Sequence, residues 1–106
     1  MLAIDIITND VIDYDFDNEG GLEINPTNKN YSFTSTDSLY TYTFFLELNN
    51  SLSNLKFTIS KFLGNNSVLE TEYHLSVGIY YFTKNDGKRI FLKILDTRVV
   101  YIVSEK

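Results

Sequence analysis

The sequence predicts an all-β protein, an antiparallel sandwich of two sheets with about seven to nine strands. The first observation is a period of two, because apolar and polar residues alternate along most of the apolar stretches. The second is the regular spacing of short runs, which are separated by polar turns rich in Asn, Asp and Gly. The third is that no window of about eleven residues has the period of an amphipathic helix. In a chain of 106 residues, these features favour a two-sheet sandwich.

The chain is expected to form one domain, residues 1–106, because its 43% apolar and 15% aromatic content suffices for a single core. It contains no cysteine, which excludes disulfides, thiolate zinc sites and cysteine nucleophiles. The first residues, MLAIDIITND, lack the basic start and unbroken apolar run of a signal peptide, so none is expected. No stretch has the apolar length of a membrane helix, and no membrane contact is expected.

The first half of the chain contains five extended segments, at residues 2–8, 11–17, 22–24, 31–34 and 39–49. In the second segment, Ile12, Tyr14 and Phe16 point to one face while three aspartates point to the other. The last segment places its even-numbered apolar residues on one face and Thr, Phe and Glu on the other. The turns between the segments include the only proline, Pro26.

The second half contains five further segments, at residues 55–60, 67–75, 79–83, 88–95 and 97–103. Leu55, Phe57 and Ile59 alternate with polar residues and are expected to face inward. Short strands at this spacing, joined by polar turns, are typical of an antiparallel sandwich.

Asp86-Gly87 lies between two alternating apolar runs, which predicts the tip of a β-hairpin with a type I′ turn. Lys84, Lys88 and Arg89 flank this tip and are expected to be solvated. A phosphate-binding loop would need a Gly-rich run that opens a helix, whereas this segment has one Gly between two strands.

The turn also predicts the register of this hairpin. A turn centred on Asp86-Gly87 places Ile79 opposite Ile94. A three-residue loop of residues 85–87 would instead place Ile79 opposite Lys93. The first register makes one apolar face continuous, and it is therefore the predicted one.

The formal net charge of −5 is unevenly distributed. Residues 1–23 contain acids but no Lys or Arg, while residues 84–98 are rich in Lys and Arg. An acidic protein is repelled by phosphate backbones, so no nucleic-acid partner is expected. A molecule polarised in this way could stack head to tail with its own copies.

The acidic stretch DYDFDNEGG is a candidate calcium loop by its composition. Such a loop needs Gly at its sixth position and Glu at its twelfth. A frame that starts at Asp15 has Gly20 at the sixth position but Pro26 at the twelfth. A frame that starts at Asp13 has Ile24 at the twelfth position. Both frames fail, and neither a metal nor another cofactor is expected.

The sequence does not predict an enzyme. His74 is the only histidine, and no G-x-S-x-G motif is present. Among the acidic residues, pairs suited to glycoside hydrolysis are not excluded, but a small sandwich with short loops leaves little room for a cleft. The many Tyr and Phe residues in strands are interpreted as core residues rather than as a sugar-stacking platform, since the chain has no Trp.

The last strand predicts a docking surface, because its apolar residues are consecutive and both of its faces avoid water. A strand or loop of the same chain, another copy or a different partner must cover the second face. The run from Tyr42 to Leu46, which contains the stretch TFFL, is also apolar on both sides and is expected to share this surface. The candidate interaction residues are Val99, Val100, Tyr101, Ile102, Val103 and Phe45.

The stretch LSVGIYYFTKNDGKRIFLKIL, residues 75–95, resembles a late hairpin of immunoglobulin-like bacterial domains, including the sorting domains that end many secreted Bacteroidetes proteins. This resemblance implies an immunoglobulin-like sandwich, without the sorting function. In its size and Asn-rich composition, the whole chain is also similar to small immunoglobulin-like accessory proteins on tailed-phage virions. That similarity implies a location on the virion if the protein is viral; otherwise the cytoplasm is expected.

The predicted function is that of a non-enzymatic structural or interaction protein that acts through protein–protein contacts, as an auxiliary or decorating component of a phage virion. Two alternatives remain open. One is a small module that binds glycans or a host surface, and the other is an acidic inhibitor that occupies a basic site of a target enzyme. The expected partner is a protein, or further copies of the chain, in a larger assembly.

Overall fold

The computed structural model describes residues 1–15, 22–24, 30–49, 54–96 and 99–105. These residues form strands and no helix. The strands are β1 (Leu2–Asp5), β2 (Val11–Asp13), β3 (Leu22–Ile24), β4 (Tyr31–Thr36), β5 (Thr41–Asn49), β6 (Asn54–Leu63), β7 (Asn66–Leu75), β8 (Gly78–Thr83), β9 (Arg89–Asp96) and β10 (Val99–Ser104).

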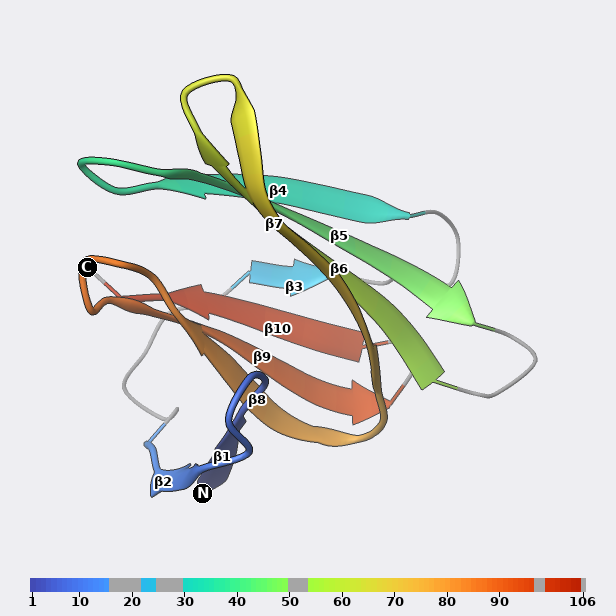
Figure 1. The fold of residues 1–106 in the computed structure, drawn as a ribbon. Helices are drawn as coiled ribbons and strands as arrows, with labels where there is room; N and C mark the ends of the chain where they lie inside the picture. Colours follow the sequence, from blue (N-terminus) through green and yellow to red (C-terminus); the bar gives the residue numbers. More distant parts are fainter. Residues whose placement is uncertain (16–21, 25–29, 50–53, 97–98, 106) are drawn as a thin grey trace.

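The strands pair into two sheets that pack face to face (Figure 1). Sheet A has six strands in the order β2-β1-β8-β9-β10-β3, and sheet B has four in the order β4-β5-β6-β7. All pairs are antiparallel except that of β1 with β8. The prediction of an all-β, two-sheet sandwich is confirmed.

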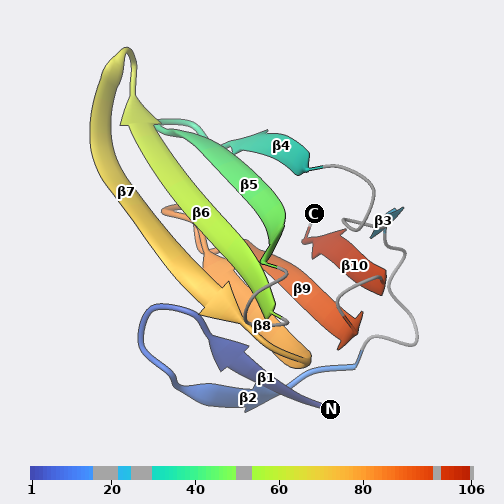
Figure 2. The same cartoon turned by 90° about the vertical axis from the view of Figure 1, so that its right-hand side faces the viewer.

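The connections are two consecutive meanders. Strands β4 to β7 follow one another across sheet B, and β8 to β10 do the same in sheet A. Immunoglobulin-like domains share the architecture of two packed sheets but use Greek-key connections between them. In this chain, by contrast, every neighbouring pair within sheet B consists of two strands that are consecutive in the sequence, as in a hairpin (Figure 2).

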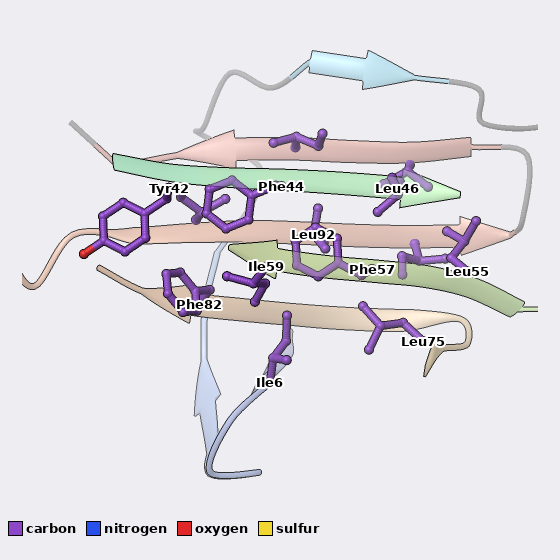
Figure 3. Close-up of a cluster of buried hydrophobic side chains, with 14 residues drawn as sticks. Ile6, Tyr42, Phe44, Leu46, Leu55, Phe57, Ile59, Leu75, Phe82 and Leu92 are labelled. Atoms are coloured by element: carbon purple, nitrogen blue, oxygen red, sulfur yellow. The ribbon is translucent and has the colours of Figure 1, made fainter. Parts of the chain in front are cut away.

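The main core lies between the sheets and is built on aromatic rings (Figure 3). Phe44 of β5 is fully buried and stacks on Phe57 of β6 and on Phe33 of β4, with ring centroids 5.8 and 4.8 Å apart. Phe82 of β8, from the opposite sheet, meets Phe44 edge-on at 5.7 Å. Edge-to-face and offset geometries suit the charge distribution of aromatic rings, so these contacts stabilise the packing of the two sheets beyond area burial.

A second cluster lies on the other face of sheet A. It consists of Ala3, Tyr81, Phe91 and Val103, which are buried, with Ile12, Tyr14 and Ile79 packed against them. The ring of Tyr14 stacks on that of Phe91 at 3.8 Å. Strands β1 and β2 continue sheet A beyond β8, and Figure 1 shows them at the end of the sheet that lies farthest from sheet B. The N-terminal hairpin thus covers part of a face that a simple sandwich would leave in water.

The hairpin tip is at Asp86-Gly87 as predicted, but the predicted register and turn type are wrong. Ile79 pairs with Lys93, which is the register of the three-residue loop. The N–H of Gly87 donates to the carbonyl of Lys84 at 2.9 Å, and Gly87 has a positive φ of 86°. This is a type I turn followed by a glycine in the left-handed region.

The physical reason is that the prediction assumed only one apolar face for this hairpin. The observed register places Phe82 opposite Ile90 in the main core and Tyr81 opposite Phe91 in the second cluster. Both faces are covered by other parts of the chain, so the pairing that serves both clusters is the stable one.

The expectation that Lys84 and Arg89 are solvated is also wrong. Lys84 is 8% exposed, and its Nζ donates to the carbonyl of Thr36 at 3.1 Å. Arg89 is half-buried and forms two side-chain hydrogen bonds of 2.8 Å with Glu105. Lys88 is exposed as expected. The hairpin tip is therefore docked on the β4–β5 turn and on the end of β10 rather than free in water.

Replacing Gly87 by valine should lower the free energy of unfolding by about 1 kcal/mol or more, because a β-branched residue resists positive φ. A Cβ at this position meets no atom within 4 Å, so the cost is conformational rather than steric. Urea unfolding measures the change. Gly87→Asn is the matched control and should cost less, since Asn tolerates the left-handed region. Equal costs for the two variants would contradict this reasoning.

Candidate interaction surface

The residues of β10 that were predicted to form a docking surface are largely core. Val100 and Ile102 are 0% and 7% exposed and belong to the main core, so they are not available to a partner. Val103 is buried in the second cluster beneath the N-terminal hairpin. Tyr101 is half-buried, and its hydroxyl donates to Glu23 of β3 at 3.1 Å. The side chain of Val99 lies outside the described residues.

This outcome corrects the docking hypothesis for the last strand. The requirement for a cover on both of its faces was sound, but around Val103 the same chain provides that cover. Phe45 also does not share a surface with β10, because it lies on the outer face of sheet B while β10 belongs to sheet A. Of the predicted interaction residues, Phe45 lies on the outer face of sheet B, where it is half-buried.

The outer face of sheet B is rich in hydroxyl groups. The register aligns Thr34 of β4, Thr43 of β5 and Ser60 of β6 in one row across the sheet. The next row contains Ser32, Phe45 and Thr58. Phe45 is half-buried in the middle of this face. Short hydroxyl side chains of this kind leave a flat surface.

One end of this face carries charge. The row Glu47, Lys56 and His74 crosses β5, β6 and β7, and Glu72 lies two residues before His74. A carboxylate oxygen of Glu72 lies 3.1 Å from the Nζ of Lys56, and the other lies 3.2 Å from the Nε2 of His74. The hydrogen bond from Lys56 lowers the pKa of Glu72, and the same bond raises the pKa of Lys56. His74 is exposed beside this pair, in a position to contact another molecule.

A polar network at the opposite end of the molecule joins the two sheets. The hydroxyl of Tyr42 donates to Asp37 at 2.8 Å and accepts from the backbone N–H of Asn85 at 2.8 Å. Burial, together with the Asp37 carboxylate, raises the pKa of Tyr42 to about 12. Lys84 reaches the same turn through its bond to Thr36. Because its groups bond to each other and to the backbone, we interpret this network as structural.

The acidic N-terminal stretch is only partly described, since residues 16–21 lie outside the described residues. In the described part, the terminal amino group of Met1 forms an ion pair with Asp13 at 2.8 Å and lowers the pKa of that carboxyl. The described residues contain no group of three or more His, Asp and Glu side chains that could hold a metal ion.

The longest strand at a sheet edge is β7. It pairs with β6 on one side, through Leu55 opposite Leu75 up to Leu63 opposite Asn66, and is the last strand of sheet B. The other edge strands are shorter, with six residues in β4 and three each in β2 and β3. The backbone groups on the free side of an edge strand are a template for pairing with another chain.

The hairpin of β6 and β7 extends beyond the rest of sheet B (Figures 1 and 2). Two apolar side chains near its tip are exposed, Leu63 by 41% and Val68 by 50%. The register shifts at Lys61–Phe62 of β6, which leaves Val68 without a partner in the ladder. This bulge bends the distal part of β7 away from the straight part of the edge.

Sequence reasoning did not find this edge. It expected a strand at residues 67–75 but had no way to tell that this strand ends a sheet. One signal was available, since the consecutive apolar pair Val68-Leu69 breaks the alternation and is typical of a bulge.

Comparison of the chain with protein-family models, with curated proteins and with solved structures finds no match. Within the described residues, there is no helix with the length and apolar character needed to cross a membrane. The functional argument therefore depends on the surface of the molecule itself.

Removing the hydroxyl of Tyr42 should destabilise the fold by about 1–3 kcal/mol, because the N–H of Asn85 and the carboxylate of Asp37 both lose a buried partner. Urea unfolding of Tyr42→Phe measures this loss. Tyr40→Phe is the matched control, because the ring of Tyr40 is half-buried beside Tyr42 and lies 4.0 Å from the Nζ of Lys61. A Tyr42→Phe variant as stable as the control would show that the network is dispensable.

Asp37 should make the stability of the protein fall in acid. The backbone N–H of Tyr40 is the main cause that lowers the pKa of Asp37 to about 2. A carboxyl whose pKa is lowered on folding stabilises the fold above its unfolded pKa, and the effect is lost as pH falls through the folded pKa. The contribution should therefore disappear between about pH 4 and pH 2. Thermal melting across this range should show a shallower pH dependence for Asp37→Asn than for wild type.

Proposed function

We propose that the protein is a non-enzymatic interaction domain that works through protein–protein contacts at the free edge of sheet B. The observation that carries this proposal is β7, a ten-residue strand that begins at a protruding hairpin and, among the described residues, pairs on one side only. Partners that add a strand to such an edge gain affinity from main-chain hydrogen bonds and specificity from alternate side chains. As the setting we propose a larger assembly, such as the phage particle that the sequence resemblance implies.

The two ends of this edge carry different kinds of side chain, which would contribute differently to a protein contact. The distal end offers Leu63 and Val68, which are exposed apolar side chains on a projecting tip. The proximal end carries Glu72 and His74 on its outer face, beside Lys56. Apolar anchors with charged groups nearby are what a specific protein contact requires, since the former supply affinity and the latter supply orientation.

A second candidate is a glycan-binding surface on the outer face of sheet B. Phe45 favours it, because this half-buried ring is surrounded by Ser32, Thr43 and Thr58 on neighbouring positions. An aromatic ring can stack on a sugar, and the hydroxyl groups around the ring can form hydrogen bonds with the same sugar. A glycan array probed with wild type and with Phe45→Ala tests this candidate.

The edge proposal predicts that an inward-pointing charge on β7 abolishes partner capture. Thr71→Lys introduces such a charge, since Thr71 pairs with Ile59 on the core side of the edge strand and natural proteins block edges in this way. Its matched control is Ser35→Lys, on the core side of β4 at the opposite edge of the same sheet. Proteins that immobilised wild type captures from an extract of its native source are identified by mass spectrometry.

Wild type and Ser35→Lys should capture the same proteins, and Thr71→Lys should lose them. Melting curves of both variants confirm that they fold. If Thr71→Lys is folded and captures the same proteins as wild type, the edge of β7 is not the contact surface and the proposal fails.

A further inference from the structure

We infer that the partner at the β7 edge is a second copy of this chain, which pairs antiparallel with β7 about a two-fold axis through Tyr73. The inference rests on the proposed function, because it names the occupant of the same edge. It would join two copies of sheet B into one continuous sheet, since β7 is the outermost strand of sheet B (Figure 2).

Two-fold symmetry restricts the possible registers. An axis perpendicular to sheet B keeps the core faces of both copies on the same side, so each side chain must meet one of the same parity. The axis therefore passes through one residue of β7. The bulge at Val68 interrupts the edge, so the regular part available for pairing is residues 69–75.

The remaining registers differ in which charged side chains of the outer face lie opposite one another. An axis through Thr71 places Glu70 opposite Glu72 of the second copy, and an axis through Glu72 places that residue opposite itself. An axis through His74 places two imidazoles opposite each other. Like charges directly opposite one another are destabilising in a sheet. The first two registers are disfavoured for that reason, and the third places no carboxylate opposite the imidazole.

An axis through Tyr73 is the register in which the charges complement each other. It places Glu72 opposite His74 of the second copy, and by symmetry this pair occurs twice. His74 already lies 3.2 Å from Glu72 within one strand, and both side chains are exposed on the outer face. Because Glu72 of the second copy would lie directly opposite His74, the imidazole N–H can donate to that carboxylate in place of the carboxylate in its own strand. Lys56, 3.1 Å from Glu72, balances the remaining negative charge.

The inner face of the same register is apolar. Tyr73 meets its own copy on the axis, and Thr71 meets Leu75. Leu75 is buried and Tyr73 packs against the main core, so the added strand would extend the core of each sandwich to its neighbour. Main-chain hydrogen bonds along residues 71–75 give the affinity, and the outer-face pairs give the register.

Cysteine cross-linking tests the register directly, because the native chain contains no cysteine. In the proposed dimer, positions 72 and 74 of the two copies are direct neighbours, whereas two residues 72 lie diagonally, about 7–8 Å apart. A mixture of Glu72→Cys and His74→Cys should oxidise to a disulfide-linked heterodimer, while each variant alone should cross-link far less. Efficient cross-linking of Glu72→Cys with itself would overturn the proposed register.

Sedimentation of the purified protein tests the charge pairs. Wild type should dimerise, and His74→Glu, which faces Glu72 of the second copy, should raise the dimer dissociation constant roughly tenfold or more. The swapped variant E72H/H74E should restore the dimer, because it exchanges the two members of each pair. Glu47→His changes a charge on the same face but on β5, and it should leave the dissociation constant unchanged.

The remaining outcomes separate this inference from the proposed function. In one outcome, wild type stays monomeric at all concentrations, while Thr71→Lys still loses a protein that wild type captures. This outcome would overturn the inference that the partner is a second copy, but it would leave the β7 edge as the contact surface. A dimer that Thr71→Lys does not disrupt uses another surface and would also overturn the inference.

Discussion

The contact between Phe44 of sheet B and Phe82 of sheet A is the interaction on which the rest of the structure depends. Phe44 also stacks on Phe33 and Phe57, so one buried ring connects three strands of sheet B with the opposite sheet. Neither sheet has a stable inner face alone, because each inner face is mainly apolar. The network of Tyr42, Asp37 and Asn85 then joins the two sheets at one end of this aromatic core.

The two sheets differ in how much of their outer faces the chain covers. The N-terminal hairpin packs against sheet A, where Tyr14 stacks on Phe91 and Ala3 is fully buried. This cover explains why Phe91 of β9 and Val103 of β10 are buried although they alternate with residues of the main core; Leu95 of β9 is not covered and is 47% exposed. The outer face of sheet B instead consists mainly of Ser, Thr and charged side chains, with Phe45 and Phe62 among them. The outer face of sheet B therefore remains available for contacts.

The free edge of β7 is the part of sheet B at which another strand could pair. Backbone groups on an edge are unpaired in the monomer, and proteins commonly protect such edges with charges and bulges. Strand β7 has both, with Glu70, Glu72 and His74 on one face and the bulge at Val68. The same charges that discourage random pairing also distinguish one symmetric register from the others, because they include both a carboxylate and an imidazole. Protection and specific association are compatible roles for one set of side chains.

The sequence by itself determined the features that depend on local alternation: the all-β class, the inward faces of residues 39–49 and 55–60, and the hairpin tip at Asp86-Gly87. A period of two and a turn signal contain this information without knowledge of the rest of the chain. Only the tertiary structure decided the hairpin register, the burial of Lys84, the cover over Val103 and the edge position of β7. Each of these features depends on which distant segment of the chain lies beside the residue. Strand order and the covering of a second face arise from contacts between residues far apart in the chain. Such contacts do not change the apolar–polar alternation within a strand, so the sequence pattern does not reveal them.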